Sequence, residues 1–304
     1  MQQKFTQEAD FRQERDFGQK IGATFEFLGA HVRPLGKCLL YFVLPAAILT
    51  GLGMGLAQSQ MFGGSTISQI GNGRFSTFSY MGPAYWFGLL ASLIGYILLG
   101  ATVYGYVRAR METPAEETVT PRQVGQYIAR YSPALLLSSI VTIVIVVFAS
   151  MLLLIPGIYL GVALSLVWTV QVLEDGDLGY SLRRSVNLIK NKWWSTFGLT
   201  LVVSFIIGMI GMVFQVPQYV AIFGKAMHWD FLSSDILLIV GGVVAAMGHL
   251  LLYSVLMLAL AFQYFNLVEK KDGYGLRQMV QTLGTTPAPV VHNTSFRPDD
   301  EGEY

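Results

Sequence analysis

Residues 133–173 read PALLLSSIVTIVIVVFASMLLLIPGIYLGVALSLVWTVQVL, a stretch without a single charged side chain. The hydrocarbon core of a membrane is about 30 Å thick, so a helix needs about 20 apolar residues to cross it. The stretch is long enough for two such helices, and Pro156 and Gly157 interrupt it. It therefore predicts a transmembrane hairpin with helices over 133–155 and 158–173.

Four further apolar stretches have the length and composition of transmembrane helices. They cover residues 38–57 and 84–107, a segment from about 197 that weakens around 215–218, and residues 236–265. The whole chain is 53% hydrophobic and only 13% charged, about half the charged share of a soluble protein. The predicted fold class is therefore all-α, a polytopic membrane helical bundle of about six transmembrane helices.

The 20 lysines and arginines give an independent prediction of orientation. All except Arg74 and Lys225 lie before the first span, in the loops after the second and fourth spans, or after the sixth. Because basic residues accumulate on the cytoplasmic side, both termini are expected there, in the inner membrane of a bacterial cell. The expected organisation is a cytoplasmic N-terminal segment over 1–36, a membrane domain over 37–267 and a largely disordered tail over 268–304.

The N-terminal segment contains the pattern of an amphipathic helix. Its apolar residues recur every three or four positions and share one face: Phe17, Ile21, Phe25, Leu28 and Val32. The opposite face is expected to be polar, with Gln19, Lys20, Glu26 and His31. Two interpretations stay open at this point: a helix lying on the cytoplasmic leaflet, or a helix packed on the protein's own loops.

A second amphipathic helix is predicted between spans four and five, as a cytoplasmic elbow. Asp177 can cap it, and Trp193 and Trp194 mark the headgroup level where the fifth span begins. Its basic residues attract anionic lipid or simply determine the topology. On the other side of the membrane, a short β-hairpin is possible within residues 63–82.

No motif for catalysis, cofactor binding or metal binding occurs in the sequence. Cys38 is the only cysteine and lies in an apolar stretch, and the four histidines are far apart in the sequence. The net charge of only +1 provides no electrostatic attraction for nucleic acid. We therefore expect no enzyme activity, no cofactor and no metal. Within the spans, glycine pairs such as Gly51 and Gly55 are interpreted as close helix contacts.

His249 is the one ionisable residue inside a predicted span, where such residues are costly and often functional. Two interpretations are kept: an imidazole hydrogen-bonded to a neighbouring helix, or part of a transport pathway.

The region around the elbow resembles the membrane domain that precedes some bacterial glycerophosphoryl diester phosphodiesterases and also occurs as stand-alone proteins. The pattern shared with that family consists of Pro156, Gly157, Tyr159, Glu174, Leu182, Arg183, Arg184, Ser185 and Trp194, with Ser181 in place of a usual alanine. The resemblance implies a six-span membrane domain. It does not imply phosphodiesterase activity, because that chemistry belongs to a separate barrel domain.

Two functions follow as expectations. The first is a non-enzymatic scaffold or accessory subunit, embedded in the lipid bilayer, with a protein partner at the cytoplasmic face. The alternative is a transporter or lipid-handling protein, suggested by His249, Pro217 and the interruption at Pro156 and Gly157, since broken helices often line binding sites.

Overall fold

The computed structural model describes residues 5, 8–61, 81–114, 116–227, 229 and 234–273. In this part of the chain every regular element is a helix, as predicted. The helices are α1 (Glu8–Phe11), α2 (Phe17–Phe42), α3 (Leu44–Met61), α6 (Pro83–Glu112), α7 (Pro121–Leu152), α8 (Leu154–Ala163), α9 (Val167–Leu173), α10 (Leu178–Ile189), α11 (Trp193–Ala226) and α12 (Asp235–Asp272). The possible β-hairpin within 63–82 and the predicted disordered tail fall almost wholly outside the described residues.

Five described helical segments are long and apolar enough to cross a membrane, or six if α2 and α3 together form one bent span. This is compatible with a multi-pass membrane protein. The bend of 51° lies at Val43, between α2 and α3. Pro45 explains it, since proline donates no backbone hydrogen bond and its ring crowds the carbonyl four residues earlier.

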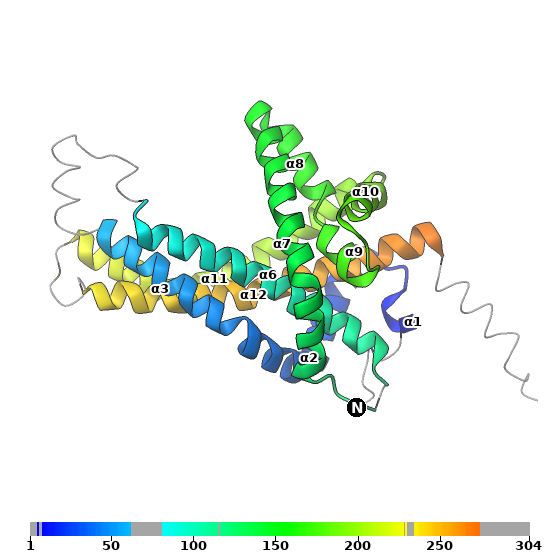
Figure 1. Cartoon of the computed structure of the whole chain (residues 1–304), viewed down its shortest axis with the longest axis horizontal. Helices are drawn as coiled ribbons and strands as arrows, with labels where there is room; N and C mark the ends of the chain where they lie inside the picture. Colours follow the sequence, from blue (N-terminus) through cyan, green and yellow to red (C-terminus); the bar gives the residue numbers. More distant parts are fainter. Residues whose placement is uncertain are drawn as a thin grey trace, which may run out of the picture.

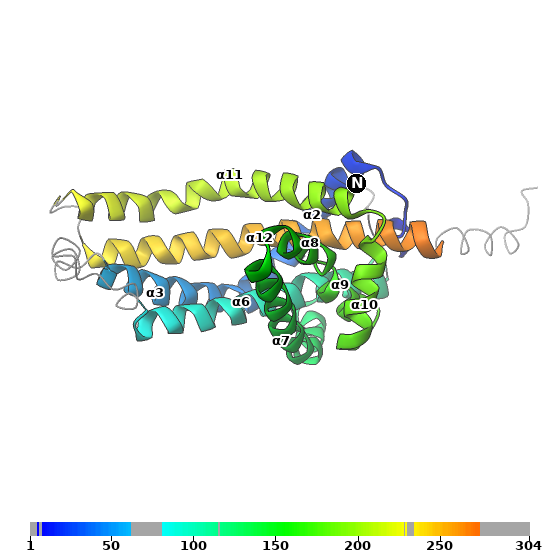
Figure 2. The same ribbon diagram turned by 90° about the horizontal axis from the view of Figure 1, so that it is seen from above.

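Helices α3, α6, α11 and α12 run along the long axis of the molecule and form a four-helix bundle (Figures 1 and 2). Neighbours along this bundle are α11 with α12, α12 with α3, and α3 with α6. Glycines allow the closest approach: a Cβ atom at Gly51 would overlap the backbone of Val243, and one at Gly55 would overlap Ile239. The predicted role of these glycines in helix packing is confirmed.

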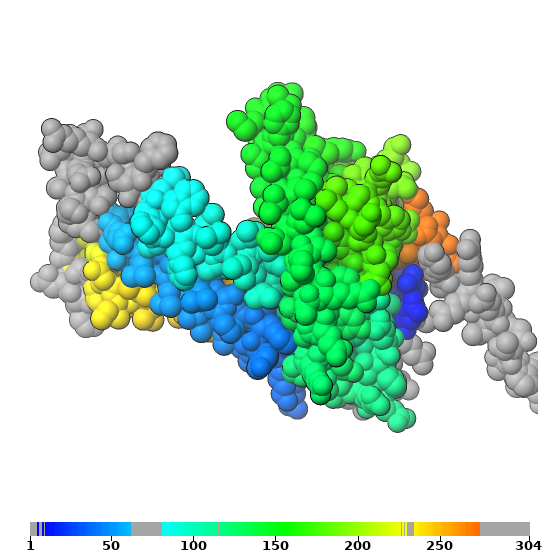
Figure 3. Space-filling view, in the orientation of Figure 1, coloured from blue at the N-terminus to red at the C-terminus, as the bar shows by residue number. Residues whose placement is uncertain are grey.

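The hairpin of α7 and α8 stands across the bundle axis and projects from it (Figures 1 and 3). The first half of α7 is buried against one end of the bundle, at Val124, Ile128 and Leu135. We call this end, which also carries Arg108 and Arg184, the basic end. The second half of α7 and the start of α8 expose their apolar side chains.

The predicted hairpin is present, but its turn was placed wrongly. The chain turns at Leu153, and Pro156 and Gly157 lie in the first turn of α8. A proline is tolerated there because the first amide groups of a helix have no partner within the helix. Gly157 serves the packing of the hairpin, since a Cβ atom there would overlap Ser150 in α7.

The predicted fourth span over 158–173 lies within Leu154–Leu173, which is long and apolar enough to cross a membrane. A turn at residues 164–166 divides this segment into α8 and α9. At about 1.5 Å per residue, the ten residues of α8 cover about half of the hydrocarbon thickness. The two arms of the hairpin are therefore unequal.

Helix α2 begins at Phe17, as predicted, but continues past Val32 to Phe42. Its faces also differ from the prediction. Phe17, Phe25 and Val32 are exposed, whereas Lys20 and His31 are buried. The reason is a second stripe on the helix, in which Phe27 and Leu35 share a face with these two polar residues and pack into the core.

Candidate functional site

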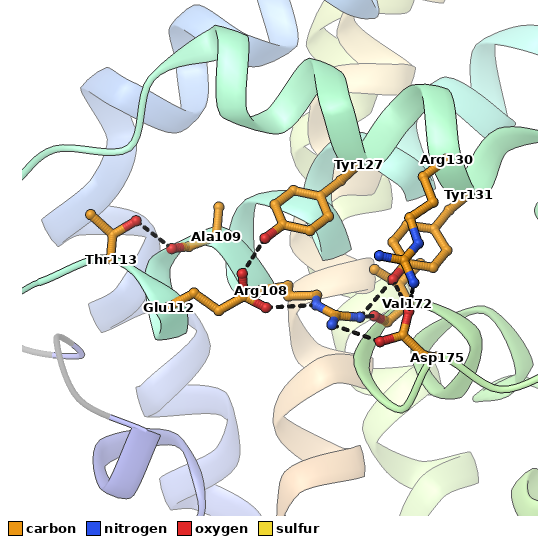
Figure 4. Close-up of polar contacts among 9 residues, drawn as sticks. All are labelled: Arg108, Ala109, Glu112, Thr113, Tyr127, Arg130, Tyr131, Val172 and Asp175. Carbon is orange, nitrogen blue, oxygen red and sulfur yellow. Dashed lines mark hydrogen bonds and ion pairs between the residues drawn. The ribbon is translucent and has the colours of Figure 1, made fainter.

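The densest group of polar contacts lies at the basic end, around Asp175 (Figure 4). Asp175 follows α9 and accepts a hydrogen bond from the hydroxyl of Tyr131. It accepts a second one, at 2.7 Å, from Nη2 of Arg108. Arg130 adds an ion pair at 3.0 Å. Arg108 also donates to Glu112, at 2.9 Å. This cluster, which we call the Asp175 cluster, joins α6, α7 and the end of α9.

The charges of the Asp175 cluster stabilise one another. The hydrogen bond from Arg108 is the main reason that the pKa of Asp175 lies below its usual value. Burial opposes the charge of Arg108, but its bonds to Asp175 and Glu112 outweigh that effect and raise its pKa. The backbone of Asp175 is left-handed, with φ of 54°, a conformation that aspartate tolerates better than most residues. The side-chain contacts hold it there.

Glu174, the residue before Asp175, organises a second group on the other side of the same turn. It accepts a hydrogen bond from Arg184 in α10 at 3.1 Å and from the hydroxyls of Tyr180 and Tyr264 at 2.6 and 2.7 Å. Arg184 also pairs with Asp272 at the end of α12. Two adjacent carboxylates therefore connect five helices at the basic end.

The predicted elbow is present as α10, and the Asp177 carboxylate caps it by accepting from the amide of Tyr180 at 2.8 Å. Ser185 is buried and donates to the carbonyl of Ala163 at 2.7 Å, which attaches α10 to α8. Ser181 is also fully buried. Arg183, by contrast, is exposed. Within the Arg183–Ser185 motif, only Arg184 and Ser185 thus make structural contacts.

Tyr159 and the two tryptophans meet at the start of α11. The indole of Trp193 donates to the carbonyl of Tyr159 at 3.1 Å and stacks on its ring at 5.7 Å between centroids. Trp194 is 77% exposed. A cavity of about 640 Å³ opens here, lined by Ile155, Ile158, Tyr159, Lys190, Lys192, Trp193 and Trp194 among others. An aromatic and apolar surface thus lies directly beside two lysines.

Sequence reasoning missed the role of Lys20, which is only 2% exposed. Its ammonium donates to Gln263 at 2.8 Å and to Ser195 at 2.9 Å, linking α2 with α12 and α11. Burial lowers its pKa to about 8, with a smaller contribution from nearby Lys270. No sequence pattern indicates this contact, because its partners lie 175 and 243 positions away.

His249 lies on α12 and its Nε2 atom is 2.6 Å from the hydroxyl of Tyr96 in α6. The ring of Tyr253 lies beside both, with centroids at 5.9 Å from His249 and 5.2 Å from Tyr96. The hydrogen bond to a neighbouring helix that one interpretation of His249 expects is therefore present. In the described part of the chain no charged side chain pairs with it.

These contacts are structural in character. Each carboxylate of the two groups at the turn is paired with an arginine or a tyrosine, and no three His, Cys, Asp or Glu side chains among the described residues gather into a possible metal site. Of the nine residues singled out from the sequence, the structure brings Glu174, Arg184 and Ser185 to the elbow. It places Pro156, Gly157 and Tyr159 on α8, with Tyr159 against the start of α11.

A protein family described as a domain of unknown function (DUF7847) matches residues 29–268. The chain belongs to this family. The match covers every described helix from the middle of α2 to near the end of α12. No curated protein and no solved structure is significantly similar to the chain. Because the family description names no activity, the resemblance to the phosphodiesterase membrane domain stays a prediction.

Proposed function

We propose that this chain is a non-enzymatic membrane protein that handles phospholipid in the cytoplasmic leaflet of a bacterial inner membrane. One observation supports this most directly: the turn of the hairpin α7–α8 is apolar and uncovered. Six side chains at this turn are between 65% and 81% exposed: Phe148, Met151, Leu152, Leu153, Leu154 and Ile155. Such a surface is costly in water and suited to acyl chains.

The orientation follows from the charges. With both termini on the cytoplasmic side, the basic end faces the cytoplasm, and the hairpin, which stands across the bundle axis, extends sideways from this end along the cytoplasmic leaflet. The cavity beside Trp193 and Trp194 then lies at headgroup level, which amphipathic aromatic rings prefer. Lys190 and Lys192 would attract anionic headgroups by about 1 kcal/mol each. The apolar hairpin and the basic, aromatic cavity together form a surface that would contact the lipids of one leaflet.

The test is lipid movement in proteoliposomes. We expect the full chain to increase the fraction of a fluorescent phospholipid that dithionite reduces from outside, because an apolar element inserted in one leaflet perturbs its packing. A variant with Phe148→Ser, Leu153→Ser and Ile155→Ser should lose most of this activity. An equal change of three lipid-facing residues away from the hairpin, Leu90→Ser, Ile94→Ser and Phe205→Ser, is the matched control. Wild-type protein that moves no more lipid than empty vesicles would refute the proposal.

A second candidate is a scaffold for a membrane partner, favoured by the exposed face of α10. A shallow cavity of about 530 Å³ there is lined by Asp177, Tyr180, Arg183 and Asn187 among others. Charges of both signs in one place suit a protein surface better than a lipid headgroup. Affinity purification in mild detergent should recover a defined partner that Arg183→Glu releases. Recovery of the chain alone would leave this candidate without support.

A further inference from the structure

A cavity of about 830 Å³ lies between α2, the basic end of α6 and the segment that leads into α7. Its charged and titratable lining consists of His31, Arg33, Lys37, Tyr106, Arg110 and Glu117. Three permanent cations therefore face one carboxylate. This cavity is distinct from the Asp175 cluster and from the cavity beside Trp193.

Arg110 is the central feature, because it is only 2% exposed and has no carboxylate partner among the described residues. Its guanidinium donates only to backbone carbonyls, those of Glu117, Thr113 and Pro114, at 2.6, 2.9 and 2.7 Å. Its Nε atom is buried without any hydrogen-bond partner. A buried cation without an anion is costly, so the site is electrostatically incomplete.

Arg33 and Lys37 extend the positive charge to the mouth of the cavity. They are four residues apart on α2, so they lie on the same side of that helix, and both are exposed. Neither pairs with a carboxylate in the described part of the chain. His31 lies deeper, with Nδ1 at 3.2 Å from the carbonyl of Phe27 and its ring packed against Phe27 and Tyr106. The wall on this side is therefore rigid.

We propose that this cavity binds a phosphate-bearing anion, with Arg110 at its base and Arg33 and Lys37 at its mouth. Arginine binds phosphate through several parallel N–H groups, and lysine adds a point charge. The volume is within the range of cavities that hold small ligands. A phospholipid headgroup and a soluble phosphate ester share this chemistry. The inference rests on the cavity's own charges and goes beyond the proposed lipid function of the hairpin.

The experiment uses the full chain in an uncharged detergent. Titration calorimetry with glycerol 3-phosphate measures the soluble source, and native mass spectrometry with phosphatidylglycerol against phosphatidylcholine measures the lipid source. The test variant is Arg33→Gln with Lys37→Gln. The control is Lys270→Gln with Lys271→Gln, which removes the same charge from two exposed positions at the end of α12, away from the cavity.

We expect the test variant to bind at least one of the two phosphate probes about tenfold more weakly, from the loss of two charge contacts, and the control to bind as the wild type does. The probe that is affected identifies the source of the ligand. A second variant, Arg110→Lys, keeps the charge but not the planar guanidinium, and should bind the same probe more weakly. The proposal would be overturned if the wild type bound neither probe. It would also be overturned if the test and control variants lost the same amount of binding affinity.

Discussion

Asp175 is the residue on which the basic end depends most. It is a short side chain in a left-handed turn, and it still contacts one tyrosine and two arginines from α6 and α7. Charge-assisted bonds of this kind are stronger than neutral ones, although the carboxylate is 39% exposed and thus partly screened by solvent. Neutralising it removes several contacts at once.

We predict that Asp175→Asn lowers the free energy of unfolding by about 1 kcal/mol at pH 7. The pKa of Asp175 is lowered in the folded state, so its contribution is complete above the ordinary aspartate pKa and disappears as the pH falls through the lowered value. The difference between wild type and variant should therefore begin to shrink below about pH 4 and vanish only once the pH is below the lowered pKa of Asp175. Denaturation in detergent at several pH values measures this. Glu116→Gln, at an exposed site, should show no such difference.

At the scale of elements, the hairpin α7–α8 raises the question of where its turn lies in the membrane. The distribution of basic residues is the same whether the hairpin crosses completely or turns within the bilayer, because both ends stay on one side. Its turn contains no polar side chain from Met151 to Ile155, and α8 is only ten residues long. Both features favour a turn inside the hydrocarbon.

We predict that a cysteine at Leu153 is inaccessible to a membrane-impermeant maleimide from either side. The background is Cys38→Ala, which removes the only native cysteine, a buried one. In the proposed orientation, Met81→Cys and Arg183→Cys lie on the outer and cytoplasmic sides and serve as reference positions. If the cysteine at position 153 reacts from the outside as fast as the cysteine at position 81, the hairpin crosses the membrane completely.

For the whole molecule, the N-terminal segment is part of the same core as the membrane helices. Phe11 is fully buried, and its ring lies 5.8 Å from Phe27 in α2 and 5.5 Å from Phe265 in α12. Arg15 adds a hydrogen bond from its backbone amide to Asn266, at 2.8 Å. The segment before α2 is therefore attached to the last helix of the chain.

We predict that Phe11→Ala lowers the free energy of unfolding by about 3 kcal/mol, the usual cost of emptying a buried phenylalanine site. Phe25→Ala, on the exposed face of α2, is the matched control and should change it little. Denaturation of the two variants in the same detergent measures the difference. Equal stability of both would mean that the N-terminal segment does not contribute to the core.

Much of the architecture was predictable because its causes are local. Apolar stretches of sufficient length predicted the long helices, and Asp177 predicted the start of α10. Each of these depends on residues within a few positions of one another. The candidate site was predictable only in part: Glu174 and Arg184, ten positions apart, were both selected from the sequence and form an ion pair.

The sequence by itself determined the helices and their apolar lengths, because helix formation and membrane partition depend on neighbouring residues. The tertiary structure alone decided which face of α2 is buried, that the chain turns at Leu153, and that α7 and α8 lie across the bundle. It also decided the contacts of Arg108 with Asp175 and of Lys20 with Gln263. These depend on which helices become neighbours, and residues distant in sequence influence one another only after the helices have packed.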